Sequence, residues 1–374
     1  MFLFAFYWYF NRVMIIYYYC YYSLFYIFAE LWGSFVLSLA FWGFANDTTK
    51  VSESKRFYAL FGLGANLALY AAGFVTPLVA NIKPGPEFSG DAFQLPINIL
   101  MGLAAFSSVA IILIYRWINR NVLTDPRFFD QSEQGRVKKE KPKMSLKDSF
   151  KFLIRSRYLL CIALIVLGYN ASIVLIESTW KDHAKQLFPT APEFSSFMGI
   201  YQQALAVTTI VMLLFVSNNV IKRFGWAVAA YLTPVVLLIT GLGFFTFIIF
   251  KEPLTPMLMT LSLSPLFVAV IFGTVQNVLS KAAKYSLFDP TKEMAYIPLD
   301  QESKVKGKAA IDTVGARLGK AGGSGIQMGL ILVFGSLGAI TPQIGVILFV
   351  VIAMWIWAIK KLDDIEFKKL EGRK

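Results

Sequence analysis

Long apolar runs separated by short polar segments dominate the chain. About 20 consecutive apolar residues are enough for a helix to cross the hydrocarbon core of a bilayer. Together with a span at 24–46, the runs of that length predict nine transmembrane helices. The other eight lie at 57–80, 96–118, 158–178, 197–221, 226–250, 254–280, 310–336 and 340–360.

The first 46 residues form one apolar block without a polar loop. We therefore assign one span at 24–46 and leave segment 1–23 unassigned. Its opening stretch, MFLFAFYWYF, is rich in aromatic residues, which is typical of the boundary between membrane and water. The segment has neither the basic start nor the small-residue cleavage site of a signal peptide, so we expect an interfacial or partial helix.

The basic residues alternate between the predicted connections. Connections on one side carry 29 of the 36 Lys and Arg residues, and those on the other side carry only Lys83, Lys181, Lys185 and Lys251. Since cytoplasmic loops hold the excess of positive charge, the large central loop and the C-terminus are predicted to be cytoplasmic. Most of the net charge of +13 therefore lies on one membrane face, where it faces anionic lipid, and nucleic-acid binding is not required.

Composition excludes several classes of protein. Hydrophobic residues make up 56% of the 374 and charged residues only 16%, which is incompatible with a soluble, disordered or collagen-like chain. The two cysteines, Cys20 and Cys161, lie in apolar runs and do not suggest a disulfide framework. The single histidine, His183, is expected on the surface of a short external loop. We expect no metal site and no cofactor.

A long basic loop at 119–157 divides the predicted spans unequally. Three spans lie in residues 24–118 and six in residues 158–360, and residues 361–374 form a cytoplasmic tail. A basic loop at this position is typical of carriers built from two six-helix halves. The sequence thus predicts an all-α, major-facilitator-like bundle of two halves that lacks the first three helices.

Charged side chains within the predicted spans are the candidate functional residues, because burying a charge in hydrocarbon is costly. They are Glu30, Glu177, Arg317 and Lys320. Alternatives stay open: Glu30 could make a structural ion pair, Glu177 could reach the outer interface, and Arg317 could pair with Asp312. Lys320 lies about 10 residues inside its span, too deep to reach water easily. Arg317 and Lys320 share a helix face among glycines and could receive phosphate.

The segment from Gly315 to Lys320 invites comparison with a P-loop. A P-loop has the spacing G-x-x-x-x-G-K-[ST] after a strand, but here one residue and the hydroxyl are missing. No other loop offers the parts for ATP hydrolysis, so the energy for transport must come from solute gradients. We expect a secondary carrier and no enzyme.

Several strings carry a specific resemblance. They are FAELWGSFVLSLAFWGFAND (28–47), ESKRFYALFGLGAN (53–66), IVLIESTWK (173–181), KYSLFDPTKEMAYIPLD (284–300) and KVKGKAAIDTVGARLGKAGGS (304–324). The chain resembles the nucleotide transporters of the ATP/ADP translocase type from plastids and obligate intracellular bacteria. This resemblance implies exchange of ATP for ADP plus phosphate across a plastid inner envelope or a bacterial inner membrane. Some relatives carry other nucleotides with protons, or NAD.

The resemblance also implies which charges matter. By motif, the important charged positions of the family fall on Glu30, Glu177 and Lys320, whereas a lysine of the early helices has no counterpart here. As hypotheses, Lys320 with Arg317 binds phosphate, and the two glutamates hold the lysines when the site is empty. The expected partners are ATP, ADP, phosphate and the lipid bilayer, and we expect a monomer.

Aromatic residues near these charges are candidates for stacking on adenine. They are Trp32, Tyr169 and Tyr201. Packing within the bundle is the alternative role for each of them. Two further functional hypotheses stay open at this point: a proton-coupled nucleotide or NAD importer, and an inactive truncated fragment.

Overall fold

The computed structural model describes most of the chain as helix. It covers residues 20, 23–29, 31–33, 36, 40–48, 51–83, 85, 91–124, 156–299, 301–311 and 315–371. Only the backbone is described for 46, 47, 51–59, 218, 301, 302, 305, 309 and 366–371. No strand occurs within these ranges, and the predicted all-α class is confirmed.

The chain divides into two compact units. The first comprises Met1–Gly62 and Ser107–Lys138, and the second comprises Leu63–Phe106 and Lys139–Lys374. The first unit holds α2 (Phe41–Thr48), the start of α3 (Val51–Ala80) and the end of α4 (Gln94–Trp117). Its ring contacts join Phe41 to Phe61 at 5.4 Å between centroids and Phe44 to Tyr115 at 5.1 Å.

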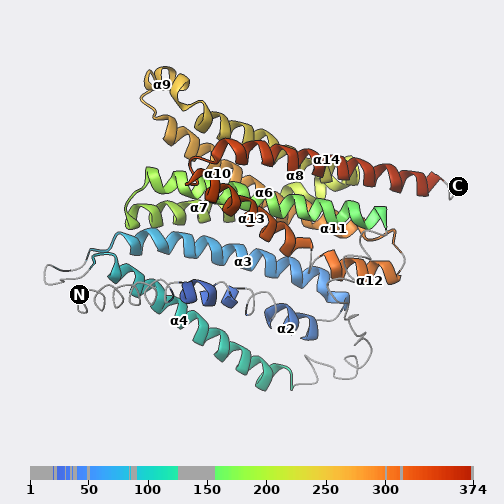
Figure 1. The fold of residues 1–374 in the computed structure, drawn as a ribbon. Helices are drawn as coiled ribbons and strands as arrows, with labels where there is room; N and C mark the ends of the chain where they lie inside the picture. Colours follow the sequence, from blue (N-terminus) through green and yellow to red (C-terminus); the bar gives the residue numbers. More distant parts are fainter. Residues whose placement is uncertain are drawn as a thin grey trace, which may run out of the picture. The chain divides into compact units, whose positions relative to one another are not determined.

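The second unit is a helix bundle with α6 at its centre (Figure 1). Helix α6 packs against α10, α13 and α14, and α8 packs against α10 and α14. The Ser156 side chain caps α6 by accepting a hydrogen bond from the Leu159 N–H. The remaining helices are α6 (Arg157–Leu187), α7 (Ala191–Val211), α8 (Ser217–Ile249), α9 (Lys251–Met259), α10 (Pro265–Ala283), α11 (Asp289–Ala295), α12 (Gln301–Ala310), α13 (Ala316–Phe334) and α14 (Thr341–Glu371).

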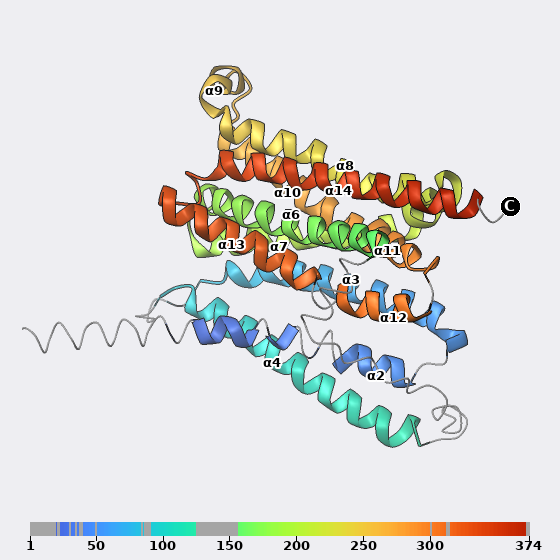
Figure 2. The same ribbon diagram turned by 45° about the vertical axis from the view of Figure 1, so that its right-hand side comes forward.

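The lysines of the terminal helices are unevenly distributed between the two ends of this bundle. The short helix α9 lies at one end, and α11, α12 and the end of α14 lie at the other (Figures 1 and 2). The basic residues of α12 and of the last turns of α14 therefore share one end of the second unit. This arrangement agrees with the alternating distribution of Lys and Arg along the sequence.

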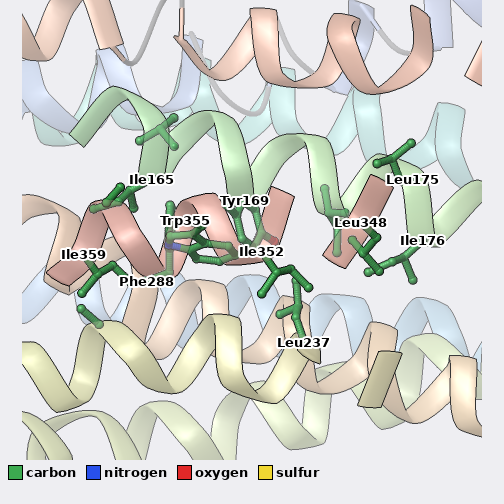
Figure 3. Packing of buried hydrophobic residues seen from close by; sticks show 14 of the residues in the cluster. Ile165, Tyr169, Leu175, Ile176, Leu237, Phe288, Leu348, Ile352, Trp355 and Ile359 are labelled. Atoms are coloured by element: carbon green, nitrogen blue, oxygen red, sulfur yellow. The ribbon is translucent and has the colours of Figure 1, made fainter. Parts of the chain in front are cut away.

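The core of the second unit is built from large side chains of α6, α8 and α14 and from Phe288, which lies after the end of α10 (Figure 3). Trp355 of α14 is fully buried, and its ring meets Tyr169 of α6 edge-on at 6.0 Å and Phe288 at 5.6 Å. Tyr169 in turn stacks on Phe288 at 4.7 Å. This cluster fixes α14 against α6 by close aromatic packing.

Seven described helical segments are long and apolar enough to cross a membrane, so the protein is a polytopic membrane protein. The predicted span at 310–336 corresponds to α13, which is not among the seven because it contains two cations and several glycines. The seven are Leu60–Ala80, Gln94–Val122, Arg157–Leu187, Ala191–Val216, Asn219–Ile249, Pro265–Ala295 and Thr341–Ile365.

The predicted continuous span at 254–280 is wrong. The chain forms α9 over Lys251–Met259, turns through Ser262 with a positive φ of 57°, and begins α10 at Pro265. The Ser264 side chain accepts a hydrogen bond from the Phe267 N–H and caps α10. Hydropathy does not detect this break because the turn is short and two leucines keep the average high, whereas Ser-Pro is a helix-start signal.

Other predicted boundaries fall partly on residues outside the described ranges. These include most of segment 1–23, part of the span at 24–46, and most of the basic loop 119–157. Helix α14 continues to Glu371, through most of the predicted tail. The division into two halves at the basic loop stays a prediction.

Candidate functional site

Glu177 forms a charged cluster between α6 and α10. Its Oε2 lies 3.0 Å from Nζ of Lys281 on α10, and its Oε1 lies 2.8 Å from Nζ of Lys181, one turn along α6. The side chains of Glu177 and Lys281 are only 26% and 23% exposed, whereas that of Lys181 is 45% exposed. One carboxylate is thus shared between two lysines, and the cluster carries a net charge of +1.

Aromatic side chains support this cluster from α6 and α7. The Lys281 ammonium lies 5.6 Å from the centroid of the Tyr201 ring, which packs on Trp180 at 4.8 Å. Trp180 is fully buried, and its indole N–H donates to the carbonyl oxygen of Val270 and to Thr274 Oγ1, both at 3.2 Å. These contacts join α6, α7 and α10 within one turn of Glu177.

Helix α13 packs on α6 through a stripe of residues four positions apart. A Cβ on Gly319 would lie 2.8 Å from Asn170 Cβ, and one on Gly323 would lie 3.2 Å from the Ala171 carbonyl oxygen. Further along, the Gln327 amide donates to Leu175 O at 3.2 Å and to the Ser178 hydroxyl oxygen. Small residues at this spacing allow close approach of two backbones, as in many membrane helix pairs.

The close packing on one side of α13 leaves its two cations exposed. Arg317 and Lys320 are both exposed, and no acidic residue of the described ranges lies within ion-pair distance of either. Their i,i+3 spacing places them on one face, as predicted. Asp312, the predicted local partner of Arg317, lies outside the described residues.

The contacts between α13 and α6 also place Lys320 relative to Glu177. Gly319 lies beside Asn170, whereas Gln327 lies beside Leu175, so the two helices run parallel. At about 1.5 Å of rise per residue, Lys320 and Glu177 are about 10 Å apart along the bundle axis. Glu177 is paired with Lys181 and Lys281, and Lys320 is not among its partners.

The remaining predicted site residues lie in different surroundings. Tyr169 is 2% exposed and stacks within the core, and Tyr201 is 4% exposed and lies beneath Lys281. Trp32, in the first unit, is 48% exposed. Glu30 lies outside the described residues. A role in stacking on adenine stays a prediction for all three aromatic residues.

Lys281 is a partner of Glu177 that the sequence analysis did not single out. Hydropathy placed it at the start of a cytoplasmic loop, whereas the structure places it in the last turn of α10, bound to Glu177. The Ser264-Pro265 signal, which marks the start of α10, could have identified it. A helix that starts there and runs for 19 residues includes Lys281, which lies within the candidate membrane span Pro265–Ala295.

His183 differs from expectation as well. The expected surface loop is wrong, because α6 continues to Leu187 and His183 is only 7% exposed, with Nδ1 at 2.8 Å from Thr179 O. His183 lines a cavity of about 370 Å³ together with Gln186, Lys251 and Thr341. None of the predicted site residues lines this cavity.

The fold and the charged cluster together define a class: an α-helical integral membrane protein with a partly buried ion pair between two helices of its bundle. Comparison with known proteins identifies the family. The model of the TLC ATP/ADP transporter family matches residues 4–366, and the chain belongs to this family. The predicted family resemblance is confirmed.

Named relatives come from bacteria and from plants. ADP,ATP carrier protein 1 of Chlamydia pneumoniae is 48% identical over 345 residues, which are 92% of this chain and 67% of the relative. The chloroplastic ADP,ATP carrier protein 1 of Arabidopsis thaliana is 46% identical over 94% of this chain and 55% of its own length. ADP,ATP carrier protein 1 of Rickettsia bellii is 44% identical over 91% and 68%. No solved structure matches the chain.

Proposed function

We propose that this chain exchanges ATP for ADP across a membrane by alternating access, in a plastid inner envelope or a bacterial inner membrane. The names of its relatives, all ADP,ATP carriers, support this function. The observation that carries the proposal is the pair of exposed cations, Arg317 and Lys320, on a glycine-rich helix that is seated closely on α6. Phosphate accompanies ADP in the proposed exchange, and the carrier acts as a monomer.

The cations would bind the phosphate chain of the nucleotide. ATP carries about four negative charges and ADP about three, so a binding site within the membrane must supply positive charge. Lys320 binds the phosphate oxygens, and Arg317 assists from the same face of α13. No acidic residue of the described part of the chain competes for either cation, which supports this role.

Glu177 would couple the two directions of transport. An unpaired charge within the membrane is costly, so a carrier whose lysines lack both carboxylate and phosphate reorients with difficulty. Glu177, and by the family motif Glu30, hold lysines while the site is empty and release them to the nucleotide. The pairing of Glu177 with two lysines supports this role. Coupling of this kind turns a uniporter into an exchanger.

Binding of the base is the least constrained part of the proposal. Trp32 is the exposed candidate for stacking on adenine, and Tyr201 lies next to the charged cluster. The tightly stacked Tyr169 would have to leave the core in order to meet a nucleotide. The proposal involves no chemical conversion of the nucleotide, only its movement.

Uptake of labelled ATP into intact cells that express the chain tests this function. We expect uptake to rise when the cells hold ADP and to be insensitive to a protonophore. An epitope tag measures how much protein reaches the membrane. Uptake that collapses with the protonophore and ignores internal ADP would instead support proton-coupled import. Absence of uptake of any nucleotide, with the protein present in the membrane, would refute the proposed exchange.

A further inference from the structure

We propose that Lys281 is a second phosphate-binding cation, which Glu177 holds in the empty carrier and releases to the incoming nucleotide. This inference rests on the proposed exchange function. It assigns a residue that neither the sequence motifs nor the family comparison identified.

The geometry shows a lysine with capacity for a further partner. An ammonium group has three donors, and the only ion pair of Lys281 within the described residues is the one to Glu177. One side of the group faces the Tyr201 ring, and the side chain keeps 23% of its surface exposed. A phosphate oxygen is therefore able to reach the ammonium without prior unfolding of the helix.

The second lysine of the cluster makes the release possible. Lys181 binds Oε1 of Glu177, and Lys281 binds Oε2. When Lys281 turns to a phosphate group, the carboxylate keeps its partner on α6. The exchange of partners therefore leaves neither charge unpaired, which removes the main obstacle to opening this partly buried ion pair.

The helices need not separate for this exchange. Val270 and Thr274 of α10 accept hydrogen bonds from Trp180, and Gly273 approaches the indole so closely that a Cβ there would lie 2.5 Å from Trp180 Cδ1. This contact holds α10 on α6 within one turn of Glu177. Rotation of the Lys281 side chain alone is then enough to open the ion pair.

A set of lysine variants tests the role. We expect Lys281→Gln and Lys281→Met to raise the KM for ATP exchange at least about tenfold, because each loses a charge-assisted contact with phosphate. Lys281→Arg keeps the charge and retains most of the exchange. Lys185→Gln is the matched control: Lys185 is an exposed lysine two turns from Glu177 on the same helix, and we expect wild-type kinetics.

A purely structural role for Lys281 predicts a different result. Competitors with three, two and one phosphate groups distinguish the two roles. The competitors are unlabelled ATP, ADP and AMP, added during uptake of labelled ATP. If Lys281 binds phosphate, its replacement weakens inhibition by unlabelled ATP most, by ADP less and by AMP least. An equal loss for all three, or a rise in heat sensitivity without this gradient, would overturn the proposal and leave a helix-joining ion pair. Membrane amounts are matched with the epitope tag.

The outcome also separates this inference from the proposed function. A wild-type chain that fails to exchange ATP for ADP refutes the function itself. A wild-type chain that exchanges normally, together with a Lys281→Gln variant of unchanged KM, refutes only the role of Lys281.

Discussion

Helices α13 and α14 both pack against α6, but by opposite means. Helix α14 uses large side chains such as Leu348, Ile352 and Trp355, all fully buried. Helix α13 uses two glycines and one amide, and leaves two cations outside the contact. We infer that α14 mainly stabilises the bundle, whereas α13 positions charges. Variants of these two helices test this division, from the largest expected effect on stability to the smallest.

Replacing Trp355 tests the stabilising role of α14. Trp355→Ala removes a fully buried ring that contacts both Tyr169 and Phe288, and large-to-small changes of this kind cost about 3–5 kcal/mol. We expect a large drop in the unfolding temperature in detergent. Trp355→Phe keeps most of the packing and removes an indole N–H for which no hydrogen-bond partner occurs among the described residues, so the loss of stability should be smaller. An equal loss for both variants would contradict the packing argument.

Adding a methyl group at Gly319 tests the close packing of α13 on α6. In Gly319→Ala the new Cβ lies 2.8 Å from Asn170 Cβ and 3.0 Å from Leu167 O, and overpacking costs about 1–3 kcal/mol. We expect lower thermal stability and reduced exchange, since the neighbouring Lys320 moves with the backbone. Gly322→Ala is the matched control, because no atom of the described part of the chain lies within 4 Å of its Cβ position. Equal losses of thermal stability and exchange at both glycines would show that α13 does not pack closely on α6 at Gly319.

Removing the amide tests the other end of the same contact. Gln327→Leu loses the hydrogen bonds donated to Leu175 O and Ser178 Oγ, and interhelical hydrogen bonds in membranes contribute about 0.6 kcal/mol on average. The Ser178 hydroxyl still donates to Val174 O at 2.7 Å, so no donor is stranded. We expect a slight drop in melting temperature. A drop as large as that of Gly319→Ala would make the amide, rather than the glycine, the main anchor.

Neutralising Lys320 should leave stability unchanged and abolish exchange. The side chain is exposed and lacks an acidic partner among the described residues, so Lys320→Gln removes no native ion pair there. Thermal unfolding in detergent and labelled ATP exchange, measured on the same preparation, separate the two effects. Unchanged ATP uptake by Lys320→Gln would refute its role in binding phosphate.

Hydropathy and charge were sufficient to predict most helices and the face shared by Arg317 and Lys320. They failed between residues 260 and 264, where a short turn follows α9 and Ser264 caps the start of α10. Because of this missed break, the span was predicted to end at residue 280. Lys281 was therefore assigned to the following loop and not to a helix. The partners of Glu177 could not be predicted either, since they depend on which helices are neighbours in space.

The close packing of α13 on α6 through Gly319 and Gly323 has a consequence for biosynthesis. Helix α13 carries two cations and is not apolar enough to count among the spans, so its own partition into lipid is weak. Helix α6, against which α13 packs, leaves the ribosome about 150 residues earlier. The strongly apolar α14 follows α13 within a few residues. We therefore expect the insertion of α13 into the bilayer to depend on α6. During translation, α13 would pack at the translocon against the already folded surface of α6.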